Sequence, residues 1–152
     1  MALRGEPATA VVFREPEVPF LQFHTLEAVD SIGRRHRFQT YQNDTQWGLC
    51  VRTVETSEQR LLESEWTGIY RLTAPVDELP TGMVEQVNLL IEDGDIEEVT
   101  LVIDSKPLLL VAGEVWEMTQ NRLEFHRFDE SVLAFTDQAT AEEIEWIPAR
   151  NR

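Results

Sequence analysis

The amino-acid sequence predicts a mainly β fold, or an α+β fold, in which an antiparallel meander curls into a sheet or a small barrel and carries one or two short helices. Three observations support this prediction. Strand-like segments recur about every eight to twelve residues, apolar and polar residues alternate within them, and turn-forming residues separate them. The sequence contains no internal repeat of fixed period.

The length and composition of the chain predict one domain with a short extension. A chain of 152 residues buries roughly two-thirds of the surface that it exposes when unfolded, and its 42% apolar content is enough for one core. Three prolines within residues 1–19 each remove a backbone donor, so this segment is predicted to be an extended N-terminal arm, with Val11–Phe13 as a candidate edge strand. Residues 20–152 are predicted to form a single strand-rich domain.

The first half of this domain contains one ambiguous segment and one clear hairpin. Residues 20–32 are predicted to begin as a strand and to become a helix after Leu26, from the spacing of their apolar residues. Two alternating segments, Phe38–Tyr41 and Trp47–Val54, flank the turn residues Asn43-Asp44-Thr45 and predict a hairpin. Further predicted features are a helical turn within Ser57–Glu63, a strand at Trp66–Thr73 and a polar connection over residues 74–82.

The clearest local structure is a second hairpin, formed by strands at 83–91 and 96–103. The Asp-Gly pair between them favours a two-residue turn, but that register would pair apolar residues of one strand with polar residues of the other. A three-residue loop, with Gly94 in the left-handed region of a bulge, restores a common apolar face. We therefore predict the longer loop. The residues expected on this buried face are Val87, Leu89, Ile91, Val99, Leu101 and Ile103.

The remaining strands continue the meander. A turn at residues 104–107 precedes Leu108–Ala112, which is apolar at every position and therefore predicts a strand buried on both faces. Further strands are predicted at 115–119, 123–127 and 132–135. From the alternation in this region, we add Leu109, Val111, Leu123 and Phe125 to the predicted core.

The end of the chain predicts a short helix. Thr140 and Glu143 have the spacing of a capping box, in which each side chain bonds a backbone N–H of the first turn. The following Ile144-Glu145-Trp146 alternates like a strand, which is the alternative prediction for these residues.

The negative charge lies almost entirely in the second half of the chain. Residues 1–71 contain 8 Arg against 10 Asp or Glu, whereas residues 72–152 contain 4 Arg and 1 Lys against 18 Asp or Glu. A field of this sign repels nucleic acid and anionic membranes and attracts basic proteins. We expect a protein partner with a basic surface, or further copies of the chain, and neither a nucleic-acid nor a membrane partner.

Two charged clusters supply the candidate partner-binding residues. The segment Gly33–Arg37 is the one dense basic cluster, and arginine binds carboxylates through a bidentate fork, although pairing with the protein's own acids is the simpler interpretation. Five carboxylates surround the Gly94 turn, where the simpler interpretation is a solvated hairpin tip. The candidates are Arg34, Arg35 and Arg37 in the first cluster and Glu92, Asp93, Asp95, Glu97 and Glu98 in the second.

The sequence contains no recognisable catalytic or metal-binding motif. The acidic turn lacks the ligand spacing of a calcium-binding loop, and the three histidines lie far apart in sequence from one another. Cys50 is the single cysteine and stands in an apolar strand without a nucleophile motif. We expect no cofactor, no metal and no catalytic residue. The lack of a disulfide pair and of a signal-like apolar run predicts a cytoplasmic, soluble protein.

Three functions fit these observations. The first is a non-catalytic acidic binding protein that docks on a macromolecular partner, as an inhibitor, an immunity-type protein or a complex subunit, because segregated charge speeds association. The second is a small-ligand-binding or catalytic β-barrel-like domain with an aromatic-lined cavity, to which any of the four tryptophans could contribute. The third is a self-assembling homo-oligomeric subunit, in which the arginine cluster of one copy meets the acidic face of another.

Overall fold

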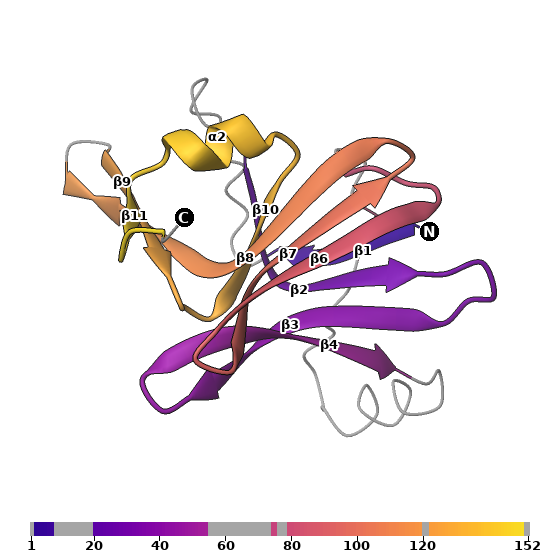
Figure 1. Cartoon of the computed structure of the whole chain (residues 1–152), viewed down its shortest axis with the longest axis horizontal. Coiled ribbons are helices and arrows are strands. Elements are labelled where there is room, and N and C mark those ends of the chain that lie inside the picture. Colours follow the sequence, from indigo (N-terminus) through magenta and orange to yellow (C-terminus); the bar gives the residue numbers. More distant parts are fainter. Residues whose placement is uncertain (1, 8–19, 55–73, 76–78, 120–121, 151–152) are drawn as a thin grey trace.

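The computed structural model describes residues 2–7, 20–54, 74–75, 79–119 and 122–150 of the chain, which form eleven strands and one helix (Figure 1). The elements in chain order are β1 (Ala2–Pro7), β2 (Leu21–Val29), β3 (Arg35–Asn43), β4 (Gln46–Val54), β5 (Ala74–Pro75), β6 (Val84–Glu92), β7 (Asp95–Ile103), β8 (Lys106–Met118), β9 (Arg122–Arg127), β10 (Ser131–Phe135), α2 (Gln138–Glu143) and β11 (Trp146–Ile147).

Six of these strands close into an antiparallel barrel in the order β8, β10, β2, β3, β4 and β7, with β7 pairing again with β8. The closure depends on the length of β8, whose first half pairs with β7, whose middle pairs with β10 and whose second half pairs with β9. A barrel pairs most backbone groups and leaves few free edges. The prediction of a mainly β fold with a small barrel and a short helix is confirmed.

The core lies on both sides of the wall formed by β8 and β10. Leu108 and Leu110 are buried in the apolar cluster inside the barrel, whereas Leu109 and Val111 are buried in a second cluster on the outer face. Successive side chains of a strand point to opposite faces, so this division follows from the strand itself. The prediction that Leu108–Ala112 is buried on both faces is confirmed.

The outer cluster is covered by β9, α2 and β11, which lie together beyond β8 and β10 (Figure 1).

The predicted short helix is present, but its N-cap residue differs from the predicted one. Asp137, rather than Thr140, is the N-cap, and its carboxylate accepts hydrogen bonds from the Ala139 backbone N–H at 3.0 Å and the Thr140 hydroxyl at 3.3 Å. The helix therefore begins one turn earlier than the capping box predicted, and Thr140 lies within it.

The predicted helix after Leu26 is wrong, because β2 continues as a strand to Val29. Both of its edges are occupied there, by β1 on one side and by β3 on the other, with Leu26 opposite Phe38. Helical spacing of apolar residues in a short segment is a weak preference, and pairing on both edges overrides it. The hairpin predicted over Phe38–Val54 is confirmed, with a two-residue turn between Asn43 and Gln46.

The β6–β7 hairpin reaches the predicted pairing by an unpredicted route. Its turn has two residues, Asp93 and Gly94, with φ of 52° and 85°, and not three as predicted. A bulge next to the turn then shifts the register, so that Leu89 lies opposite Val99. The hairpin therefore has both the tight turn that Asp-Gly favours and apolar residues opposite one another, because the bulge accommodates one extra residue.

The predicted core is wrong for β6. Val87, Leu89 and Ile91 are each more than half exposed to solvent, with exposed fractions of 54%, 51% and 56%. They share a face with buried residues of β7, but β6 lies outside the closed barrel, so the interior does not extend beneath it. Leu123 is partly buried, and the other predicted core residues are buried as expected: Val99, Leu101, Ile103, Leu109, Val111 and Phe125.

Several predictions fall outside the described residues. These are the candidate edge strand at Val11–Phe13, the helical turn within Ser57–Glu63 and the strand at Trp66–Thr73. Within the N-terminal arm, Ala2–Pro7 forms β1 and pairs with β2 and β5. Among the described residues, no helix has the length and apolar character needed to span a bilayer.

Candidate functional site

The arginine cluster binds the protein's own acids. Pairing of β2 with β3 places Glu27 directly opposite Arg37, and Arg35 lies two residues from Arg37 along β3. The Glu27 carboxylate is fully buried and accepts from Arg37 at 2.7 Å and from Arg35 at 3.3 Å. A buried carboxylate requires such charged partners, since desolvation would otherwise cost several kcal/mol. Two of the three candidate arginines therefore have a structural role.

The third arginine belongs to a network around Asp30. Burial tends to raise the pKa of Asp30, but hydrogen bonds from the His36 ring, from the backbone and guanidinium of Arg34 and from the Ile32 N–H outweigh it and lower the pKa to about 2. The Arg34 side chain is nevertheless 59% exposed. It is the candidate arginine most accessible to a partner.

Three of the five candidate acids are buried, contrary to the interpretation of this segment as a solvated tip. Asp95 accepts from the Tyr41 hydroxyl and from the Asn43 amide, and Glu98 accepts a bidentate pair from Arg150 at 2.6 and 2.7 Å. Glu97 lies 3.4 Å from the buried guanidinium of Arg127. Only Asp93 is exposed, and Glu92 is half-buried. These acids therefore bind the hairpin to the rest of the fold.

Glu97 has the most perturbed carboxyl group among these acids. Burial, a hydrogen bond with Glu92 and repulsion from Glu92 and Glu98 raise its pKa to about 7, against the attraction of Arg127. Arg127 also donates to the carbonyls of Pro148 at 2.8 Å and Ala149 at 3.0 Å. The pair consequently connects the barrel to the C-terminal segment.

The described residues show no grouping of three or more His, Cys, Asp or Glu side chains that could hold a metal ion. Cys50 is half-buried in β4. Glu114 is half-buried in β8, and burial together with repulsion from Asp129 and Glu130 raises its pKa. The Thr53 hydroxyl lies 3.2 Å from His36 Nδ1, and His36 Nε2 lies 3.1 Å from the Asp30 carboxylate, so a hydroxyl, an imidazole and a carboxylate contact one another in series. The expectation of no catalytic residue stays a prediction.

The strongest surface feature is an apolar stripe on β6, which sequence analysis assigned to the core. It consists of Val87, Leu89 and Ile91 on one face, with Leu90 39% exposed on the other. Met83, directly before the strand, is 73% exposed. No local signal in the sequence distinguishes this surface from a buried one, because the alternation of β6 is the same in both cases.

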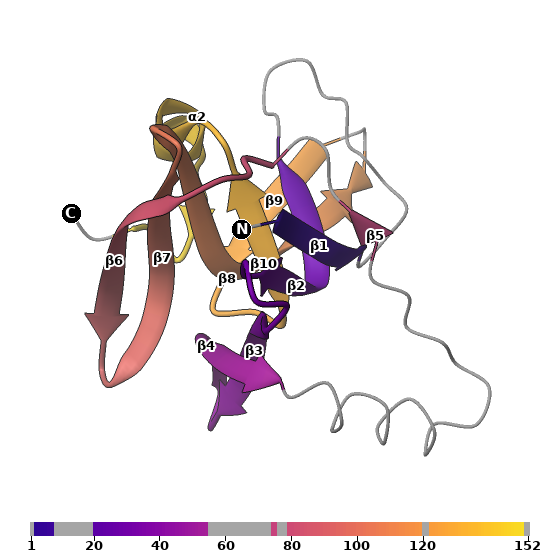
Figure 2. The same cartoon turned by 90° about the vertical axis from the view of Figure 1, so that its right-hand side faces the viewer.

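The backbone edge of β6 is also open within the described part of the chain, where β6 pairs with β7 alone. Figure 2 shows β6 as the outermost strand at the left side of the molecule, with β7 and then β8 beside it toward the middle. Natural edge strands are usually protected by lysine, proline or inward charges. None occurs between Gln86 and Ile91, so this edge has the properties of a strand-pairing site.

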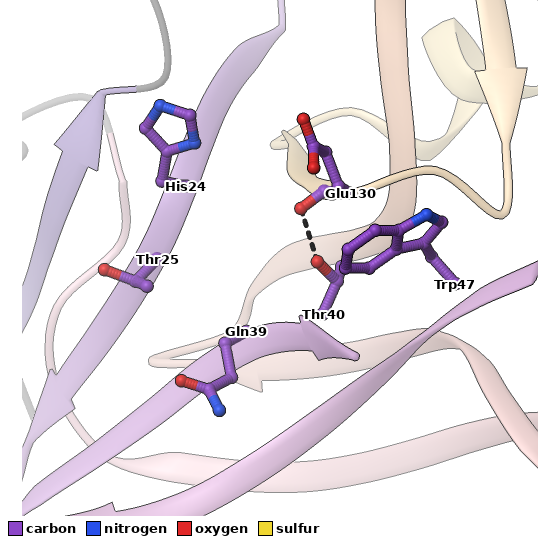
Figure 3. Close-up of a pocket in the computed structure, with 6 residues that line it drawn as sticks. All are labelled: His24, Thr25, Gln39, Thr40, Trp47 and Glu130. Carbon is purple, nitrogen blue, oxygen red and sulfur yellow. Dashed lines mark hydrogen bonds between the residues drawn. The ribbon is translucent and has the colours of Figure 1, made fainter. Parts of the chain in front are cut away.

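A second feature is an open cavity of about 370 Å³ where the sheet forks (Figure 3). Strands β2 and β3 pair only from Leu26 onward; before that point β2 pairs with β10 and β3 continues with β4. The wedge between them is lined by His24, Thr25, Gln39, Thr40, Trp47 and Glu130.

Hydrogen bonds between separate elements hold the walls of this cavity. The Thr40 hydroxyl donates to the Glu130 backbone carbonyl, and the backbone N–H of Trp47 donates to the backbone carbonyl of Phe128 at 3.1 Å. In Figure 3 the His24 ring lies across the opening from the Trp47 indole and the Glu130 carboxylate. Of the other tryptophans, Trp146 is buried, Trp116 is 45% exposed and stacks on His126 at 3.9 Å, and Trp66 lies outside the described residues.

Comparisons of this chain with models of protein families, with curated proteins and with solved structures found no match.

Proposed function

We propose that this protein is a non-catalytic binding protein that docks on a macromolecular partner, and that an extended segment of the partner adds to the open edge of β6. The observation that carries the proposal is the coincidence of an open backbone edge with three exposed apolar side chains, Val87, Leu89 and Ile91, on one face of the same strand. In strand addition, backbone hydrogen bonds supply affinity and alternate side chains supply specificity.

The energetics favour covering this stripe. Full burial of a Val, Leu or Ile side chain is worth about 1.5–3 kcal/mol, so covering the exposed half of each gains on the order of 1 kcal/mol. Three such gains, together with a ladder of backbone hydrogen bonds, are enough to oppose part of the entropy lost on association. The charged clusters proposed from sequence contribute less, because most of them are paired internally.

The test compares three baits in a native lysate of the source organism, with captured proteins read by mass spectrometry. The baits are the wild type, a Val87→Lys/Leu89→Lys variant and a matched control, Val51→Lys. Val51 is 49% exposed on β4, so the control introduces one lysine, against two in the double variant, at a strand position of similar exposure. We expect wild type and control to bind the same partner and the double variant to bind it about 10- to 100-fold more weakly.

Capture alone does not decide the question. Hydrogen exchange of the purified complex must show new protection of the β6 amides, because strand addition pairs them. A partner that binds all three baits equally, or that protects another surface, contradicts the proposal. Equal circular dichroism and equal urea midpoints for the three baits exclude unfolding as the cause.

A second candidate function is the binding of a small polar molecule in the cavity at the fork of β2 and β3. The specific observation is the arrangement of the Trp47 indole and the Glu130 carboxylate opposite the His24 ring around one opening. An apolar wall with a few convergent polar groups is typical of ligand sites. Native mass spectrometry of the purified wild type separates the two functions, since a retained small molecule without any captured protein favours the cavity.

A further inference from the structure

We infer that the segment added to β6 comes from a different protein and carries a basic residue at each end of an alternating apolar strand. This inference rests on the proposed function and names the chemistry of the partner. Its basis is the placement of acids at both ends of the apolar stripe, Glu85 at one end and Asp93 at the other, both exposed.

The charge complementarity is local to the stripe. Glu85 lies at a register shift between Val84 and Gln86, so it is the bulged residue at the start of the stripe, and Asp93 follows the strand directly in the turn. The six residues between Glu85 and Glu92 carry no charge. Among the described residues, Lys106 on β8 is two strands away from Val84 through Ile103, and Arg150 is already paired with Glu98, which lies opposite Leu90. An added strand with Lys or Arg opposite the two acids would form favourable cross-strand pairs.

The same acids disfavour a second copy of this chain as the occupant. Antiparallel pairing of two β6 strands about Leu89 matches the apolar side chains but places Glu85 of each copy at the Asp93 end of the other. Parallel pairing in register sets Glu85 against Glu85. Like charges directly opposite each other destabilise a strand pair, and two chains of net charge −15 also repel at long range. The structure thus favours a basic partner over homo-oligomerisation.

The experiment uses the full chain and two synthetic nine-residue peptides. Both have Val, Leu and Ile at positions 3, 5 and 7 with Thr as spacer, and they differ only at their ends, which are Lys in one and Glu in the other. Two opposite-charge pairs should make the Lys peptide bind about 2- to 30-fold more tightly in a fluorescence anisotropy titration. This preference should shrink as salt is raised, because the end pairs are exposed.

A charge variant tests the assignment to Glu85 and Asp93. In Glu85→Lys/Asp93→Asn, where asparagine retains the tolerance for positive φ at the turn, the preference for the Lys peptide should disappear or reverse. The apolar contribution should remain, so the Glu peptide should bind at least as well as it binds the wild type. The control Val51→Lys should keep the wild-type preference.

The outcomes separate the inference from the proposed function. Equal binding of both peptides, lost in Val87→Lys/Leu89→Lys, supports strand addition but overturns the basic partner. No binding of either peptide overturns both. A wild-type dimer at micromolar concentration in sedimentation velocity, dissociated by Val87→Lys/Leu89→Lys, overturns the inference in favour of self-assembly.

Discussion

Glu27 illustrates how a single buried residue determines the role of its neighbours. Its carboxylate has no exposed surface, and it is satisfied by Arg35 and Arg37 from the adjacent strand. Arg35 and Arg37, which resemble a partner-binding patch in the sequence, therefore stabilise the pairing of β2 with β3. The partner of these arginines has no local signal in the sequence, because the pairing depends on the register between β2 and β3.

We predict that Arg37→Ala lowers the free energy of unfolding by about 2–3 kcal/mol, because it leaves the buried Glu27 carboxylate with Arg35, at 3.3 Å, as its remaining charged partner. Urea denaturation measures the change. The matched control is Arg34→Ala, whose side chain is 59% exposed and whose ion pair should be worth less than about 1 kcal/mol.

A companion variant, Glu27→Leu/Arg37→Met, should recover much of the stability, since removing both charges removes the desolvation cost as well. If Arg37→Ala and Arg34→Ala had equal effects, the structural role assigned to Glu27 would be incorrect.

At the scale of elements, β8 combines two roles in one strand. It forms part of the barrel wall with β7 and β10 and then continues outward to pair with β9. Sequence analysis divided this element into two strands with a break around Gly113. The residue marks the position where β8 changes partners, with Ser131 of β10 on one side and Arg127 of β9 on the other.

We predict that Gly113→Ala destabilises the protein by about 1–3 kcal/mol through overpacking. A Cβ at this position would lie 2.5 Å from the backbone carbonyl oxygen of His126, which cannot move without disturbing β9. Thermal and urea unfolding measure the loss.

Gly94→Ala is the comparison for this variant. Its site is open but has φ of 85°, so the cost should be about 1 kcal/mol and should arise from the backbone alone. A smaller loss in Gly113→Ala than in Gly94→Ala would contradict the close approach of β8 to β9.

At the scale of the whole molecule, buried ion pairs connect the barrel to its outer layer. Glu97 and Glu98 of β7 pair with Arg127 of β9 and with Arg150 near the C-terminus. Three acids of the second half of the chain, Asp95, Glu97 and Glu98, are therefore buried and structural. The net charge still acts over distance, but the surface available to a partner is the β6 stripe rather than these carboxylates.

We predict that the stability of the protein falls between pH 5 and pH 8. The folded pKa of Glu97 is about 7, above the ordinary value of 4.5, so the folded state binds more protons than the unfolded state in this interval. Stability therefore decreases as pH rises toward 7, by on the order of 1–3 kcal/mol from this group. The facing charges are Arg127, Glu92 and Glu98.

Urea denaturation at pH 5, 6, 7 and 8 measures this dependence, and Glu97→Gln should reduce it. The raised pKa of Glu114 acts in the same direction and remains in the variant, so the comparison of wild type with Glu97→Gln isolates Glu97. A stability that increases over this interval equally in both proteins would show that Glu97 is ionised throughout.

The sequence by itself determined the mainly β class, the two hairpins, the doubly buried strand at Leu108–Ala112 and the short C-terminal helix. Alternation and turn chemistry are local, so they can be read from neighbouring residues. Only the tertiary structure decided that β2 stays a strand after Leu26, because its two partners come from distant segments. The same holds for the β6 stripe, whose alternation is identical whether a barrel covers it or solvent does.

The candidate site was predictable to a smaller extent than the fold. The charges at residues 34–37 and 92–98 were visible in the sequence, but their burial and pairing were not, since both depend on which strands lie side by side. The cavity lined by His24, Trp47 and Glu130 joins three separate segments of the chain and has no local signal. Residue types can be read locally, whereas exposure is a property of the closed barrel and of the strand that lies outside it.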